Sequence, residues 1–137
     1  MNISHPNNAV FHIGRIGLAS LFILGGLNKL VDPSQTVVDM AGIGVPWPSG
    51  IVFAVVAVEL GLGLLLAAGG WLRQGRFIPL SALLLTIHAA VINVTVHPFW
   101  LMERPEAQIE LSLFFKNVSI MGGLVMLAAL YLPSAKR

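Results

Sequence analysis

The sequence predicts an all-α membrane protein, a bundle of four transmembrane helices in a single domain that covers residues 1–137. Hydrophobic residues make up 56% of the chain and charged residues only 10%, and the mean hydropathy is +0.85. Soluble globular domains are far less apolar. A helix needs about 20 apolar residues to cross about 30 Å of hydrocarbon. Four stretches have roughly that length, at residues 10–30, 51–68, 77–96 and 111–132.

The first stretch, 10–30, follows a polar lead that lacks a basic segment, and no small-x-small cleavage pattern closely follows it. We therefore expect it to be retained as an anchor rather than removed as a signal peptide. Arg15 and Lys29 lie on one stripe of this helix at opposite ends. Arg15 is expected to extend to the membrane interface. For Lys29, beside Asn28, the interface and a functional site are equally favoured.

Between the first two spans, the segment Asp32-Pro33-Ser34-Gln35 is typical of a helix start, and Gly42 of a helix end. A short interfacial helix is therefore expected here. The segment Val45-Pro46-Trp47-Pro48 then favours an extended turn, with its tryptophan at the level of the lipid headgroups.

The second span, 51–68, holds Glu59 as its single ionisable residue. An isolated carboxylate in hydrocarbon is very unfavourable, so Glu59 is expected to be protonated or paired with a lysine. The candidates are Lys29 and Lys116, and Lys116 lies nearer in depth. A buried pair of this kind binds a ligand or only fixes the register of the helices, and ionisable residues inside a membrane favour a site.

On the third span, Asn93 and His97 are four residues apart and so share one helix face. Pro98 ends that helix, which places His97 at its mouth. Lys116 and Asn117 lie inside the next span, where a charge needs a partner. We expect these two helix mouths to face each other. His88 lies off this line and is expected to be a core residue bonded to a carbonyl group.

Several classes of function are excluded by what the sequence lacks. With no cysteine, the chain has no disulfide, thiolate metal site or dithiol relay. A net charge of +2 without a basic tract does not suggest nucleic-acid binding. The histidines at 88 and 97 do not share a face, so no metal site is predicted. No covalently bound cofactor is expected.

The distribution of charge predicts the orientation in the membrane. Arg15, Arg73, Arg76, Lys136 and Arg137 fall on the side that holds both termini, whereas the opposite side is mainly acidic. By the positive-inside rule both termini are cytoplasmic. The longer loops, with Trp47 and Trp100, then face outward, and the polar groups converge in the outer half of the bundle.

Five motifs in chain order resemble the DoxX family. They are the run from Leu21 to Leu30 (LFILGGLNKL), the run from Met40 to Pro46 (MAGIGVP), the segment Glu59-Leu60-Gly61-Leu62-Gly63, the segment His97-Pro98-Phe99-Trp100, and Phe115-Lys116-Asn117 followed by Gly122-Gly123. The resemblance covers roughly residues 13–132. It implies a small four-helix protein of a bacterial cytoplasmic (inner) membrane. Some members are subunits of membrane oxidoreductases such as thiosulfate:quinone oxidoreductase, which suggests a role with quinone.

The first hypothesis is accordingly a subunit of a quinone-linked membrane oxidoreductase with a polar pocket. Glu59 and His97 would handle protons, and Lys29 and Lys116 would hold the developing anion of a reduced quinone or another small anionic substrate. The remaining candidates for binding are polar or aromatic groups around these residues, namely Asn28, Asn93, Trp100 and Asn117.

Two alternatives are kept beside it. The chain contains no evident nucleophile, so it could be a non-catalytic accessory or assembly subunit, docked through its glycine-rich faces onto a larger membrane complex or a second copy of itself. A small carrier is less favoured, because four short helices without broken segments or an inverted repeat are poorly suited to transport. Whether the chain is itself an enzyme is left open among these hypotheses.

Overall fold

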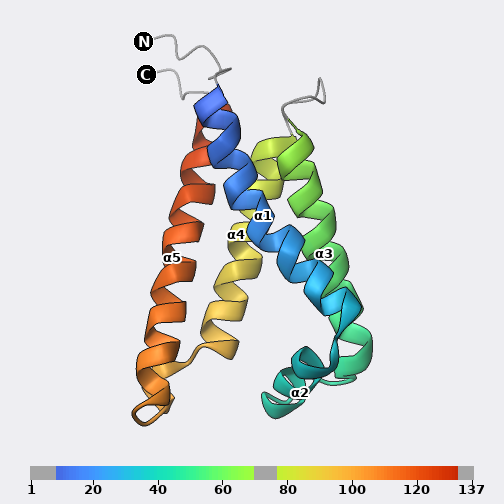
Figure 1. Ribbon diagram of the computed structural model, residues 1–137, viewed down its shortest axis with the longest axis vertical. Helices are drawn as coiled ribbons and strands as arrows, with labels where there is room; N and C mark the ends of the chain where they lie inside the picture. The colour runs from blue at the N-terminus through green and yellow to red at the C-terminus, as the bar shows by residue number, and fades with distance from the viewer. Residues whose placement is uncertain (1–8, 70–76, 133–137) are drawn as a thin grey trace.

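The computed structural model describes residues 9–69 and 77–132, and all regular structure in these ranges is helical. The four long helices are α1 (Ala9–Val31), α3 (Pro48–Ala68), α4 (Phe77–Val96) and α5 (Glu106–Tyr131). The short helix α2 (Ser34–Gly42) joins α1 to α3, and a 3-10 turn, η1 (Phe99–Leu101), lies between α4 and α5 (Figure 1). In the described ranges four helices are long and apolar enough to cross a membrane, so the predicted all-α, four-span architecture is confirmed.

The ends of the helices follow the sequence with one notable exception. Helix α5 begins at Glu106, five residues before the predicted start at residue 111. The prediction counted apolar residues and therefore excluded the polar first turns, which contain Glu106 and Glu110. A helix of 26 residues is about 39 Å long, longer than the about 30 Å of the hydrocarbon layer. The first turns of α5 can therefore extend into the interface.

Helix α2 is the short helix expected between the first two spans. The carboxylate of Asp32 accepts hydrogen bonds from the Ser34 hydroxyl at 2.5 Å and the Ser34 backbone N–H at 3.1 Å. These two bonds hold the pKa of Asp32 below its usual value, because they stabilise the charged form. Asp32 thus bonds the start of α2 as the sequence suggested, whereas the Gln35 side chain donates to Asp39 and not back toward Asp32.

The four long helices pack as two pairs (Figure 1). Helix α1 lies against α3, α4 lies against α5, and α3 also contacts α4. The start of α1, the end of α3, the start of α4 and the end of α5 share one end of the bundle. Helix α2 and η1 lie at the opposite end, where Figure 1 shows the two pairs diverging. The connection order alone requires this arrangement for four spanning helices.

Two glycines allow α1 and α3 to approach closely. A Cβ atom added at Gly26 would lie 2.8 Å from Cγ of Leu60 and 3.2 Å from Cβ of Glu59. One added at Gly63 would lie 3.0 Å from Cγ1 of Ile23. Small residues at such positions are a common means of helix association in membranes, because they let the backbones come together.

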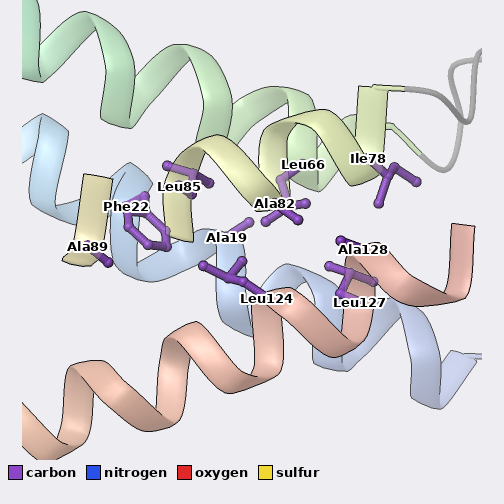
Figure 2. Packing of buried hydrophobic residues seen from close by; sticks show 10 residues of the cluster. All are labelled: Ala19, Phe22, Leu66, Ile78, Ala82, Leu85, Ala89, Leu124, Leu127 and Ala128. Atoms are coloured by element: carbon purple, nitrogen blue, oxygen red, sulfur yellow. The ribbon is translucent and has the colours of Figure 1, made fainter. Parts of the chain in front are cut away.

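The apolar core occupies the half of the bundle toward the ends of α3 and α5. All four long helices contribute to it, and the side chains interdigitate between them (Figure 2). Its buried members are Ala19, Phe22, Leu66, Ile78, Ala82, Leu85, Ala89, Leu124, Leu127 and Ala128. The buried carboxylate Glu59 lies outside this core, toward the other half of the bundle.

Two expectations about cations have different outcomes. Arg15 does not extend to the interface: it is 1% exposed, and its Nη2 lies 3.3 Å from Nδ1 of His12. It is the largest of the fully buried side chains. The other cations that carry the predicted orientation, Arg73, Arg76, Lys136 and Arg137, lie outside the described residues, so the cytoplasmic location of the termini stays a prediction.

Candidate functional site

Glu59 is the centre of a buried charge cluster that joins three helices. It lies near the middle of α3 and is 4% exposed. Nζ of Lys29, from α1, lies 2.9 Å from Oε2 and 3.1 Å from Oε1 of Glu59. Nε2 of His88, from α4, lies 3.2 Å from Oε1. An ionised carboxylate can only accept hydrogen bonds, so Lys29 and Nε2 of His88 are the donors.

The structure decides between the two lysines proposed as partners of Glu59. Lys29 is the partner, and Lys116 is exposed on α5. The nearer depth of Lys116 was a poor guide, because α5 packs mainly on α4 and not on α3. The close crossing of α1 and α3 at Gly26 brings Lys29 within reach instead. Its ammonium group also lies 3.4 Å from the carbonyl oxygen of Gly25.

His88 belongs to this cluster, although it was expected to bond a carbonyl group. The sequence does contain a signal for it. Ser81, Leu85, His88 and Ile92 are spaced by four, three and four residues, the spacing of one helix stripe. Ser81 and Leu85 on that stripe are fully buried. The prediction followed the polar stripe that contains Asn93 and His97 and so missed the apolar stripe that turns His88 toward α3.

A cavity of about 180 Å3 lies beside the cluster, between the α1/α3 pair and the α4/α5 pair. Its polar lining is Lys29 from α1, Glu59 from α3, His97 directly after α4, and Asn117 from α5. The rest of the lining is small or apolar: Leu21, Phe22, Gly25, Ala89, Ile92 and Ile120. Because Lys29 and His97 lie at the α2 and η1 end of their helices, the cavity is in that half of the bundle.

His97 forms a second acid–imidazole pair at the edge of the cavity. Its Nδ1 lies 2.6 Å from Oε2 of Glu110 on α5. Their side chains are 17% and 23% exposed, respectively. In the sequence, Glu110 lies just before the predicted fourth span, 111–132, and was not predicted to belong to the site. Yet Glu110 and Asn117 are seven residues apart, two turns of helix, and therefore share the face of α5 that borders the cavity.

Asn93 and Asn117 connect α4 to α5 by their side-chain amides. Nδ2 of Asn117 donates to Oδ1 of Asn93 at 3.1 Å, and Nδ2 of Asn93 donates to the carbonyl oxygen of Phe114 at 3.2 Å. Asn93 is 1% exposed and does not line the cavity. The structure therefore gives Asn93 a role in positioning Asn117, which itself borders the cavity.

Besides Asn93, three other predicted site residues lie outside the cavity lining. Asn28 and Lys116 are exposed on α1 and α5, respectively. Trp100 is 51% exposed in η1, and its ring packs edge-on against Phe99 and Phe114 at centroid distances of 5.1 and 5.8 Å. It is well placed to lie among lipid headgroups.

Chemically, the site combines a fixed carboxylate, one ammonium group and two imidazoles beside a small partly apolar space. Among residues 9–69 and 77–132, no three side chains of His, Asp or Glu are grouped to hold a metal ion. The groups present can bind a polar oxygen atom, hold a proton and release it.

These features define an integral membrane protein with four candidate spanning helices and an ionisable site in its interior. The chain belongs to the DoxX family, whose model matches residues 10–98. It is 32% identical over 118 residues to the inner membrane protein YphA of Escherichia coli (strain K12), an alignment that covers 85% of this chain and 79% of YphA. The resemblance seen in the sequence motifs is thereby confirmed. No solved structure matches the chain.

Proposed function

We propose that this chain is a subunit of a quinone-linked oxidoreductase in a bacterial inner membrane, and that the cavity beside Glu59 binds the quinone head. The observation that carries the proposal is the cluster of Glu59, Lys29 and His88 beside that cavity. Burying a carboxylate and an ammonium group is costly, and in membrane helices such groups usually mark a site. The location in an inner membrane is supported by the similarity to YphA.

The dimensions of the cavity favour a single small ring over a larger ligand. Sites for drug-sized molecules have about 300–1,000 Å3, whereas this cavity has about 180 Å3. Its lining offers apolar side chains for the faces of a ring and polar groups for its oxygens. The isoprenoid tail of a quinone would remain in the surrounding lipid.

Reduction of a quinone to a hydroquinone consumes two electrons and two protons. The chain holds no cysteine for an iron–sulfur cluster, so the electrons are assigned to a redox-active partner subunit. Lys29 would donate a hydrogen bond to one quinone oxygen and stabilise the negative charge that develops there. His88, through Glu59, and His97 would supply the protons.

Binding of a short-tailed ubiquinone analogue to the purified protein in mild detergent tests the proposal. Titration followed by tryptophan fluorescence should show saturable binding to the wild type. Loss of a hydrogen bond to a charged group costs about 1.5–3 kcal/mol, so Lys29→Met should weaken binding about 10- to 100-fold. Arg104→Gln removes an exposed cation outside the cavity and serves as the matched control. A wild-type protein that binds no quinone would contradict the proposal.

A second candidate, a non-catalytic accessory subunit, is favoured by one specific observation. Both oxygens of Glu59 are already occupied by Lys29 and His88, as in an ion pair that fixes the register of three helices. Purification in mild detergent separates the two candidates. A stoichiometric large partner together with an absence of quinone binding would support the accessory role, whereas quinone binding by the isolated chain would oppose it.

A further inference from the structure

We propose that His97 and Glu110 form a proton relay between the cavity beside Glu59 and the water at the α2 and η1 end of the bundle. This inference gives a function to Glu110, which the proposed quinone site does not use. That the relay carries protons for a quinone rests on the proposed function. Proton transfer by His97 and Glu110 can be measured without a quinone.

The geometry of the pair carries the first step. His97 lines the cavity, and its Nδ1 lies 2.6 Å from Oε2 of Glu110. Because an ionised carboxylate can only accept, Nδ1 carries the hydrogen, and Nε2 of a neutral imidazole is then the basic nitrogen. The two nitrogens of one ring therefore have the different states that a relay requires.

Glu110 lies where it can exchange a proton with water at the membrane interface. Helix α5 has 26 residues and is about 39 Å long, about 9 Å more than the hydrocarbon layer. If the C-terminal end of α5 lies at one edge of the hydrocarbon layer, about six residues at the other end extend beyond that layer. These residues are the first turns of α5, where Glu110 lies. The Glu110 side chain is 23% exposed, against 5% for Glu59. Glu110 thus joins the buried half of the site to the interface.

The cavity supplies the connection between the two acid–imidazole pairs. Its volume of about 180 Å3 is enough for several water molecules. Polar groups line it from α1, from α3, from the residue that follows α4, and from α5. The titratable groups that face this space are Lys29 on α1, Glu59 on α3 and His97 after α4. His88 on α4 contacts Glu59, and Glu110 on α5 contacts His97.

The step is a proton transfer without change of oxidation state. Nε2 of His97 accepts a proton from a hydronium ion in the cavity, which becomes water, and the imidazolium gives its Nδ1 proton to Glu110. The covalent Nδ1–H bond breaks, an O–H bond forms on the carboxylate, and Glu110 releases that proton to water. Rotation of the ring, which turns the protonated nitrogen toward Glu110 and the bare nitrogen toward the cavity, resets the pair. The reverse sequence delivers a proton to Glu59 and His88.

Exchange of the His88 ring N–H with water measures the relay directly. The protein is labelled with 15N-histidine, held in detergent micelles and examined by NMR. Glu110→Gln keeps the size and a hydrogen-bond acceptor but cannot carry a proton. We expect exchange to slow about a hundredfold, the low end of what a positioned proton carrier contributes. Glu106→Gln, an exposed glutamate on the first turn of α5, is the matched control and should leave exchange unchanged.

Chemical rescue distinguishes a relay from a merely structural contact. In Glu110→Ala, added acetate should restore exchange in proportion to its concentration, because it replaces the missing carboxylate. Unchanged exchange in Glu110→Gln would overturn the relay, and so would slow exchange that acetate does not restore. Glu110 does not line the cavity, so Glu110→Gln should bind the ubiquinone analogue like the wild type. If the wild type binds no quinone while Glu110→Gln still slows exchange, the proposed function fails and the relay stands.

Discussion

Glu59 shows how one residue can join elements far apart in the sequence. Its partners Lys29 and His88 are 30 and 29 residues away along the chain, and they come from the two helices on either side of α3. The ion pair is largely buried in the bundle, since the Glu59 side chain is 5% exposed and that of Lys29 is 22% exposed. Removal of one member leaves a buried charge without its counter-ion.

Glu59→Gln should therefore lower the stability of the protein. Breaking a buried ion pair from one side costs on the order of 3–5 kcal/mol. The measurement is unfolding in detergent, followed by circular dichroism. Glu106→Gln is the control, because its exposed carboxylate should contribute no more than about 0.5 kcal/mol.

The double variant Glu59→Gln/Lys29→Met should recover part of this loss, since it removes the stranded ammonium group as well. Glu59→Gln/Lys116→Met should show no recovery, because Lys116 is exposed on α5. Recovery of stability in Glu59→Gln/Lys116→Met but not in Glu59→Gln/Lys29→Met would contradict the observed pairing.

At the scale of the helices, the contact between α1 and α3 depends on two small residues. Gly26 and Gly63 let these helices approach so closely that a Cβ atom at either position meets a side chain at 2.8 to 3.0 Å. The same approach brings Lys29 to Glu59. Gly122 on α5 differs, because nothing lies within 4 Å of a Cβ atom built on it. Glycines that look equivalent in the sequence therefore have different roles.

Gly26→Ala should destabilise the protein, because the added methyl group must displace Leu60. Overpacking of this kind typically costs about 1–3 kcal/mol. Gly122→Ala should be neutral or slightly stabilising, since alanine is the better residue in a helix by about 0.5–1 kcal/mol. Unfolding by sodium dodecyl sulfate, followed by tryptophan fluorescence, compares the two. Equal effects would show that α1 and α3 do not need the close contact at Gly26.

At the scale of the whole molecule, the apolar core and the cavity lie in different halves of the bundle, although Arg15 is buried at the core end. The core of Figure 2 lies toward the ends of α3 and α5, and the cavity lies toward α2 and η1. Tight packing at one end holds the two helix pairs together while they diverge at the other (Figure 1). This division leaves room for buried charges without loss of a continuous core.

The orientation predicted from the charges puts the half of the bundle that contains the cavity toward the outer surface. Because the chain has no cysteine, single cysteines can report on it directly. A cysteine at Glu103, in the exposed loop before α5, should react with a membrane-impermeant maleimide in intact cells. A cysteine added after Arg137 should react only after lysis, as the positive-inside rule predicts. The opposite pattern would place the termini outside.

The sequence by itself determined the membrane class, the four spans, the short α2 helix and the presence of a buried ionisable group at Glu59. It also indicated His97 and Asn117, which both line the cavity. These properties are readable because hydropathy and helix capping act locally, so a window of neighbouring residues contains the information that decides them.

Only the tertiary structure decided which groups meet: Lys29 and not Lys116 with Glu59, His88 in the same cluster, Glu110 with His97, and Arg15 buried. Each of these depends on which helix lies beside which and on how each helix is rotated about its axis. Membrane helices pack by the fit of side chains distant in sequence. Depth along a span therefore predicts where a charge lies across the membrane, but not the partner that it meets.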